Sequence, residues 1–316
     1  MYDTAYPGGH ASRQLRSIAE TVCKVYYSVS YEVCFLPPSP AVTSVELTQA
    51  LLTQAIPGGD FTHSVSGTAT VIFAAPDRIA LLSCAHIFAS PDTITTFFRD
   101  STGVSTDRIS SVSVAGKREI FISDLPGGTP WRVLLGDRDR DIAIVARELS
   151  APLRESVPVL TCPLGRARQL GWGAFTYVVG HPRGTGTITT GIVSQPDRDG
   201  EGGFLVDALF NTGSSGSIVL ALRNGLPNLE LVGMAVSASG STESYLMPKE
   251  GGGDHQDASL PYEGDVYVED HTALHYGITH VVPAESIRAL LFENRGDLLA
   301  EGYDFGTFIG LASSGG

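Results

Sequence analysis

Short apolar runs, each ended by turn residues, recur along most of this sequence. Between residues 22 and 33, valine and tyrosine occupy alternate positions, the period expected of a β-strand with one buried face. Runs at 70–73 and 79–82 flank Pro76-Asp77-Arg78, which predicts a β-hairpin. The 316 residues include 36 glycines and 18 prolines, and few segments have a helical pattern. We therefore expect an all-β protein built from many short strands joined by turns.

The predicted strands fall into two series separated by a linker at 150–157. Their spacing favours antiparallel barrels or sandwiches over alternating strands and helices. Two helices are expected, one at 44–55 and one at 284–293, where Pro283 precedes the helix and Gly296 follows it. Residues 1–18 are polar and are expected to be frayed or draped over the surface. The remaining predicted strands are 93–98, 110–114, 119–123, 131–135 and 142–146 in the first series, and 174–179, 187–194, 203–209, 217–222 and 229–236 in the second.

The formal net charge of −13 argues against two classes of partner. A nucleic-acid-binding protein needs a basic face, and an anionic membrane surface would repel this chain. No apolar stretch approaches the roughly 20 residues that cross a bilayer, and no secretory signal is recognised, so we expect a cytoplasmic location. The four cysteines form no Cys-x-x-Cys pair. Cys23 and Cys34 could form a disulfide, but buried free thiols are favoured.

Three short segments carry the residue types of nucleophilic catalysis. His86 follows an apolar run, Asp141 opens another, and Ser215 stands in Gly213-Ser214-Ser215-Gly216. A histidine can act as general base towards a serine nucleophile, and an aspartate can orient that histidine. Each segment alone is more often structural: an edge histidine, a turn aspartate or a flexible glycine loop. Together they predict a catalytic triad.

These segments and their neighbours resemble the trypsin-like serine proteases of the chymotrypsin fold, with the HtrA (Deg) branch as the nearest resemblance. The order His, Asp, Ser is the chymotrypsin order, whereas subtilisins and α/β-hydrolases use other orders. The resemblance implies two six-stranded antiparallel β-barrels, a C-terminal helix and an active site between the barrels. After 293 too few residues remain for the PDZ domain common in the HtrA branch. The resemblance to the family is carried by the triad segments and by further short segments. These are Ser66-Gly67-Thr68-Ala69, Val179-Gly180-His181-Pro182-Arg183-Gly184, Thr190-Gly191-Ile192-Val193-Ser194, Leu231-Val232-Gly233-Met234-Ala235 and 277–283.

The resemblance also implies roles for single residues. Ser215 would be the nucleophile, His86 the general base and Asp141 its orienting partner, with the N–H groups of Gly213 and Ser215 forming the oxyanion hole. Such an enzyme needs neither cofactor nor metal, and its partner is a protein or peptide substrate. The sequence departs from the family pattern around the nucleophile, where Ser214, Ser217 and Ile218 replace the usual Asx, glycine and proline.

By the same resemblance, the primary specificity pocket would be lined by uncharged residues. Such a pocket favours small or aliphatic side chains, because a buried lysine or arginine would lack a partner there. His280 lies nearby and is expected to have a structural role. The residues expected in the pocket are Leu209, Val236, Ser237, Ala238, Gly277 and Thr279.

The segment 250–270 contains seven acidic residues and no lysine or arginine. We expect a solvated loop, and a flap beside the pocket is the functional alternative. Its acids and histidines match no known spacing of metal ligands. The six residues considered as ligands are Asp254, His255, Asp257, Asp270, His271 and His275.

The expected domains are an N-terminal extension with a strand and a short helix (1–60), a first barrel (61–155), a second barrel (156–282) and a helix with a tail (283–316). The leading hypothesis is a serine endopeptidase. A catalytically inactive binding module of the same fold is the alternative, and an α/β-hydrolase esterase is disfavoured because the second glycine of Gly-x-Ser-x-Gly is missing after Ser215. The oligomeric state stays open.

Overall fold

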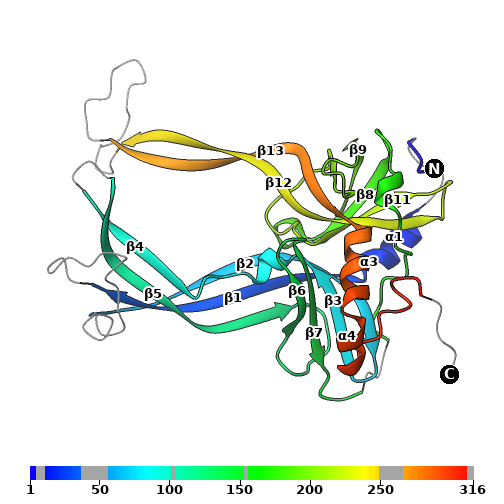
Figure 1. The fold of residues 1–316 in the computed structure, drawn as a ribbon, viewed down its shortest axis with the longest axis horizontal. Helices are drawn as coiled ribbons and strands as arrows, with labels where there is room; N and C mark the ends of the chain where they lie inside the picture. The colour runs from blue at the N-terminus through cyan, green and yellow to red at the C-terminus, as the bar shows by residue number, and fades with distance from the viewer. Residues whose placement is uncertain (5–10, 37–55, 101–103, 153–155, 249–265, 312–316) are drawn as a thin grey trace.

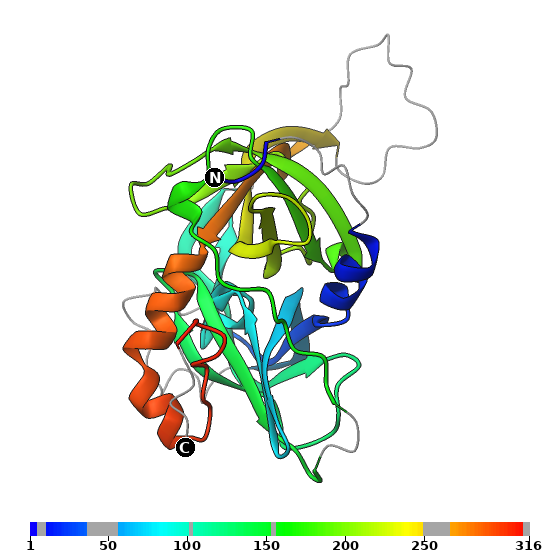
Figure 2. The same ribbon diagram turned by 90° about the vertical axis from the view of Figure 1, so that its right-hand side faces the viewer.

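The computed structural model describes residues 1–4, 11–36, 56–100, 104–152, 156–248 and 266–311, with the backbone alone described at 239–248 and 266–277. Two antiparallel β units form the body of the molecule, and α3 (Ala284–Glu293) and α4 (Arg295–Ala300) follow them in the chain. Figure 2 shows these two helices along one side of the body, in orange, and α1 (Ser12–Ala19) on the other side, in blue.

The first unit is a seven-stranded sheet with the strand order β4-β5-β1-β2-β3-β7-β6. Strand β1 is an inner strand of this sheet and pairs with β2 on one side and β5 on the other. The alternation seen in the sequence is real, because Val25, Tyr27, Val29 and Tyr31 are all buried. The strands are β1 (Val22–Phe35), β2 (Ile56–Ala75), β3 (Arg78–Ser83), β4 (Thr93–Arg99), β5 (Ser105–Ile122), β6 (Arg132–Asp137) and β7 (Ile142–Glu148).

The second unit is a closed six-stranded barrel with the order β10-β13-β12-β11-β8-β9. Strands β12 and β13 continue beyond it as a two-stranded ribbon, paired from Gly240↔Leu274 to Pro248↔Val266. Figure 1 shows this ribbon and the long strands of the first unit extending in the same direction. The strands are β8 (Phe175–Gly180), β9 (Thr187–Gln195), β10 (Phe204–Val206), β11 (Ser217–Leu222), β12 (Leu229–Pro248) and β13 (Val266–Pro283).

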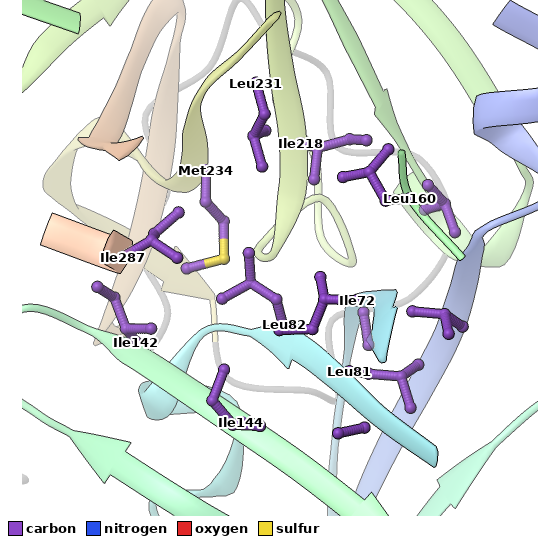
Figure 3. Packing of buried hydrophobic residues seen from close by; sticks show 14 of the residues in the cluster. Ile72, Leu81, Leu82, Ile142, Ile144, Leu160, Ile218, Leu231, Met234 and Ile287 are labelled. Carbon is purple, nitrogen blue, oxygen red and sulfur yellow. The ribbon is translucent and has the colours of Figure 1, made fainter. Parts of the chain in front are cut away.

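One hydrophobic cluster joins the two units. Leu82 and Ile142 of the first sheet, Ile218 and Met234 of the barrel and Ile287 of α3 belong to the same buried set (Figure 3). Burial of apolar surface is the main favourable term in folding, so the contact between the units is part of the core. The two edges that carry the triad segments are therefore fixed relative to each other.

The predicted fold class, two antiparallel barrel-like units with a C-terminal helix, is confirmed, and α3 has the predicted bounds. The runs at 110–114 and 119–123 form one strand, β5, because the chain stays extended through Gly116. Residues 12–18 were expected to be frayed but belong to α1, which buries Ile18 in the shared core. The helix expected at 44–55 lies outside the described residues, and the domain boundaries stay a prediction.

Candidate active site

His86 and Asp141 lie at the ends of two neighbouring strands of the first sheet. Strands β3 and β7 are antiparallel, and Ser83 near the end of β3 pairs with Ala143 near the start of β7. The chain leaving β3 forms a short 3₁₀ turn, Ala85–Phe88, that carries His86. Asp141 immediately precedes β7. The two side chains thus meet although 55 residues separate them.

Two hydrogen bonds join this pair. The Nδ1–H of His86 donates to Asp141 Oδ2 at 2.7 Å, and the His86 backbone N–H donates to Oδ1 at 2.8 Å. Asp141 has a positive φ of 54°, a conformation that aspartate tolerates better than most residues. With Nδ1 donating, Nε2 of a neutral imidazole is free to accept a proton. The arrangement can orient a general base.

Cys84 is a buried neighbour of this pair. Its sulfur, a ring nitrogen of His86 and an Asp141 oxygen lie within 4.8 Å of one another, so the three residues could be considered for a metal ion. Burial, with the nearby Asp141 charge, raises the pKa of the Cys84 thiol well above its usual value. A thiol that stays protonated at neutral pH is a poor metal ligand, and this one contacts the Ala235 carbonyl at 3.6 Å.

Ser215 lies on a tight loop between β10 and β11, at the edge of the barrel. Two glycines shape it, Gly213 with φ of 92° and Gly216 with φ of 91°. A Cβ at Gly213 would lie 2.7 Å from the His181 carbonyl, and one at Gly216 would lie 2.0 Å from the carbonyl of Thr68. Both positions therefore require glycine for conformation and for space.

The backbone of this loop is held in one orientation by hydrogen bonds. The Thr212 carbonyl accepts the N–H of Arg183 at 2.7 Å, and the Ser214 carbonyl accepts the N–H of Ser217 at 2.9 Å. The N–H of a planar trans peptide points opposite to its C=O. The N–H groups of Gly213 and Ser215, which follow those two carbonyls, are thus directed away from these contacts and have no acceptor among the described residues.

Three residues that secure the loop were given no role from the sequence: Thr68, Ser83 and His181. Thr68 donates hydrogen bonds to two carbonyls of the loop, from its hydroxyl to Gly213 and from its N–H to Ser215. The hydroxyl of Ser83 in turn donates to the Thr68 carbonyl at 2.7 Å. The ring of His181 donates from Nε2 to the Val22 carbonyl at 3.0 Å, which ties the barrel to β1. The only signal was their place within segments that resemble the family, since their contacts are made between distant parts of the chain.

The hydroxyl of Ser215 donates to the Val236 carbonyl at 3.2 Å, and within the described residues no hydrogen bond joins it to His86. Val236 lies where the pairing of β12 with β13 shifts between Ala235 and Ser237. Such an irregularity leaves a backbone group outside the ladder, which makes the carbonyl available to the serine. The structure thus brings Ser215 against β12 and brings His86 against Asp141.

The residues predicted for the specificity pocket occupy neighbouring strands in part. Ala238 of β12 pairs with Thr279 of β13, and Ser237 pairs with His280. Thr279 is buried and donates to the Ala208 carbonyl at 2.8 Å. Leu209 is 61% exposed in the loop after β10. Of Gly277, only its place in β13 is described.

A hollow of about 240 Å³ is lined by Val236 and several charged residues, and among the described residues it includes none of the others predicted for the specificity pocket. His280 lines it and accepts a hydrogen bond from Arg198 at 2.7 Å on Nδ1. Burial, with the neighbouring Arg198 charge, lowers the pKa of His280. Arg140, Asp199 and Glu201 also line the hollow.

The acidic segment 250–270 falls almost wholly outside the described residues. Asp254, His255 and Asp257 are not described, and only the backbone of β13 is described at Asp270, His271 and His275.

The free cysteines are Cys23, Cys34, Cys84 and Cys162, as expected, and Cys34 is only half-buried. In the part of the chain that the structure describes, no helix is both long and apolar enough to cross a membrane.

Solved structures with a similar fold include a serine-to-alanine variant of the HtrA-type protease AlgW with a decapeptide. That match has a TM-score of 0.50 and 16% identity, and it covers 93% of this chain and 68% of that one. The AlgW structure with a tripeptide matches with a TM-score of 0.44 and 16% identity, over 93% and 65% of the two chains. No curated protein matches the sequence.

The sequence itself matches the family model of the trypsin-like peptidase domain over residues 67–234. This is more than half of the chain, and it includes His86, Asp141 and Ser215. It runs from β2 in the first sheet to β12 in the barrel, so it spans both β units. The chain belongs to the trypsin-like peptidase domain family.

Proposed function

We propose that the protein is a serine endopeptidase that cleaves peptide bonds through an acyl-enzyme on Ser215. The Ser215 hydroxyl loses its proton to His86 Nε2 as Oγ attacks the scissile carbonyl. The protonated His86 then gives that proton to the leaving amine. In the second half of the reaction, water attacks the acyl-enzyme and loses a proton to His86, which returns it to Ser215 Oγ as the bond to the acyl group breaks. Asp141 holds the imidazole in the tautomer that accepts at Nε2.

The observation that carries this proposal is the double hydrogen bond of Asp141 to His86. A single contact could be a surface ion pair, but two contacts to one carboxylate fix both the position and the tautomer of the ring. The exposed fractions of the side chains are 44% for His86 and 24% for Asp141, so the ring stays reachable for a substrate. This combination is what a general base needs.

The orientation of the Ser215 loop supports an oxyanion hole as well. The N–H groups of Gly213 and Ser215 are the donors predicted from the sequence, and neither is used by another described group. In acyl transfer, donors of this kind act on the negative charge that develops on the carbonyl oxygen, and loss of one typically costs about 100- to 1000-fold in kcat.

Cleavage after small or aliphatic residues is the substrate preference we propose. Val236 and Ala238 present short side chains on β12, and the neighbouring Thr279 turns its hydroxyl to the Ala208 carbonyl. A lysine or arginine side chain would find no carboxylate among these three residues. Peptide-library cleavage tests this, and preferred cleavage after lysine or arginine would contradict it.

The second candidate function is a catalytically inactive module that binds peptides. It is favoured by one observation, the hydrogen bond from the Ser215 hydroxyl to the Val236 carbonyl instead of to His86. A serine held in this way is not activated as a nucleophile. Rotation about one side-chain bond would release it, so the two candidates differ in a measurable reactivity.

Labelling with a fluorophosphonate probe separates the two candidates. An active serine endopeptidase is labelled, Ser215→Ala is not, and the matched control Ser217→Ala is still labelled because Ser217 is a buried residue of β11. Wild-type protein that stays unlabelled would favour the inactive module, and labelling that survives Ser215→Ala would overturn Ser215 as the nucleophile. Peptide hydrolysis by the same three proteins gives an independent readout.

A further inference from the structure

Thr68 lies on β2 at the point where the first sheet meets the Ser215 loop. It is completely buried, and each of its polar groups is bonded. Its N–H donates to the Ser215 carbonyl at 2.7 Å, and its Oγ1–H donates to the Gly213 carbonyl at 2.8 Å. Its Oγ1 accepts the His181 N–H at 2.9 Å, and its carbonyl accepts the hydroxyl of Ser83.

The bond to Gly213 is made to the most adaptable residue of the loop. Glycine occupies positive and negative φ with similar ease, so its neighbours must decide how its peptides are turned. On one side, the Thr212 carbonyl is held by Arg183. On the other side, the Gly213 carbonyl is held by the hydroxyl of Thr68. Without that hydroxyl, the second peptide loses its side-chain contact with the first sheet.

The same peptide is also held through its N–H group. The Ser214 N–H, which points away from the Gly213 carbonyl, donates to the Asn211 carbonyl at 2.9 Å. A turn of this peptide would therefore break two hydrogen bonds and change the ψ of Gly213 and the φ of Ser214. The peptide lies between the two peptides that carry the N–H groups of Gly213 and Ser215, so these two torsions set the directions of the two donors relative to each other.

We propose that Thr68 is a positioning residue for the oxyanion hole, whose hydroxyl fixes Gly213 so that its N–H is directed at the developing oxyanion. The inference rests on the proposed function and deepens it. The oxyanion charge forms fully only in the transition state, so the loss of this contact lowers kcat and leaves KM nearly unchanged. A contact that only stabilised the fold would lower the melting temperature and spare kcat.

The same strand offers a matched control. Thr70 lies two residues further along β2 and is also completely buried, but its Oγ1 has no hydrogen-bond partner among the described residues. Replacing threonine with valine keeps the shape and removes the hydroxyl. At Thr68 this change removes two hydrogen bonds of the side chain, and at Thr70 it removes none.

The experiment measures kcat and KM for peptide hydrolysis, together with the melting temperature, in Thr68→Val, Thr68→Ser and Thr70→Val. Because a displaced donor loses part of its effect on the oxyanion, we expect Thr68→Val to lower kcat about 10- to 100-fold. Its KM should stay within about twofold of the wild type. Thr68→Ser restores the hydroxyl and should recover most of the activity, whereas Thr70→Val should behave as wild type.

Wild-type kcat in Thr68→Val would overturn the proposal, as would equal losses in Thr68→Val and Thr70→Val. If Thr68→Val does not fold, Thr68→Ala replaces it, since the smaller side chain cannot overpack the site. An unchanged kcat in Thr68→Ala would then overturn the proposal. Wild-type protein without hydrolysis or fluorophosphonate labelling would overturn the proposed function itself, and this inference with it.

Discussion

The two halves of the candidate active site are held in different ways. His86 and Asp141 meet through direct hydrogen bonds between two neighbouring strand ends of one sheet. The Ser215 loop belongs to the barrel, where the turn that contains Arg183 holds one of its carbonyls, but two further carbonyls, those of Gly213 and Ser215, are held by Thr68 of the first sheet. The first half is assembled within its own sheet, whereas the second depends on how the two units pack.

This difference indicates where each half is vulnerable. A change at His86 or Asp141 removes a catalytic group and leaves the surrounding backbone unchanged. A change in the Ser215 loop shifts the backbone itself, because its glycines lie against backbone carbonyls of other segments. The catalytic effects should therefore be largest for the chemical groups and smaller, but more dependent on geometry, for the loop.

The largest effect is expected for Asp141→Asn. Asparagine also tolerates the positive φ at this position and can still accept the His86 N–H, so the fold should be unchanged. Its amide donates where the carboxylate accepts, which forces the wrong imidazole tautomer and should lower kcat about 10⁴-fold. Steady-state hydrolysis near neutral pH measures this. Asp139→Asn is the control, and an equal loss there would show an effect of charge alone.

Gly213→Ala should have the next largest effect. The new Cβ would meet the His181 carbonyl at 2.7 Å, and alanine does not favour a φ of 92°. The loop must shift, so kcat should fall about 100- to 1000-fold, as for the loss of one oxyanion donor. Gly225→Ala is the control, since it imposes a similar φ of 82° in open space. Equal losses of activity in both variants would contradict a local effect at the loop.

Much of the fold could be predicted because local patterns dominate it. The alternation of Val25, Tyr27, Val29 and Tyr31 reports a half-buried strand directly, and the proline before α3 marks where that helix begins. The helix α1 was missed because its eight residues are mostly polar and too few to form a stable helix alone, so it is ordered by its packing. The extension of β12 and β13 beyond the barrel was missed too, because strand pairing at that distance has no local signature.

The candidate site could be predicted as residue types in order, but only part of its geometry could. The apolar runs predicted strands at 79–82 and 142–146, and the resemblance implied that Asp141 orients His86. The pairing of β3 with β7 that makes this contact is seen only in the structure. The contact of Thr68 with the Ser215 loop could not be predicted, because it joins residues 145 positions apart. Nor could the alternative partner of the Ser215 hydroxyl, since it depends on a shift of strand register at Val236.

The third prediction tests whether the two units unfold together. Leu82 of the first sheet and Leu220 of the barrel are both completely buried in the shared core. Replacing either with alanine should lower the free energy of unfolding by about 2–5 kcal/mol. Because one core joins the units, both variants should keep a single transition in denaturant, followed by fluorescence and circular dichroism. If Leu82→Ala unfolded in two separate transitions while the Leu220 variant kept one, the first sheet would be shown to unfold independently.

The smallest effect is expected for Glu293→Gln, which tests whether α3 helps to position Asp141. Glu293 binds Arg140, the residue before Asp141, through hydrogen bonds of 2.7 and 3.1 Å. Both side chains are partly exposed, at 34% for Arg140 and 50% for Glu293, so solvent screens the pair and its loss should cost about 0–1 kcal/mol of stability. Urea denaturation at low and high salt measures that cost, which should disappear at high salt.

The hydrogen bonds of Asp141 to His86 do not involve the Arg140–Glu293 pair, so kcat of Glu293→Gln should stay at the wild-type value. A clear fall in kcat would mean that the first half of the site also depends on a distant element, and the contrast between the two halves would then be one of degree.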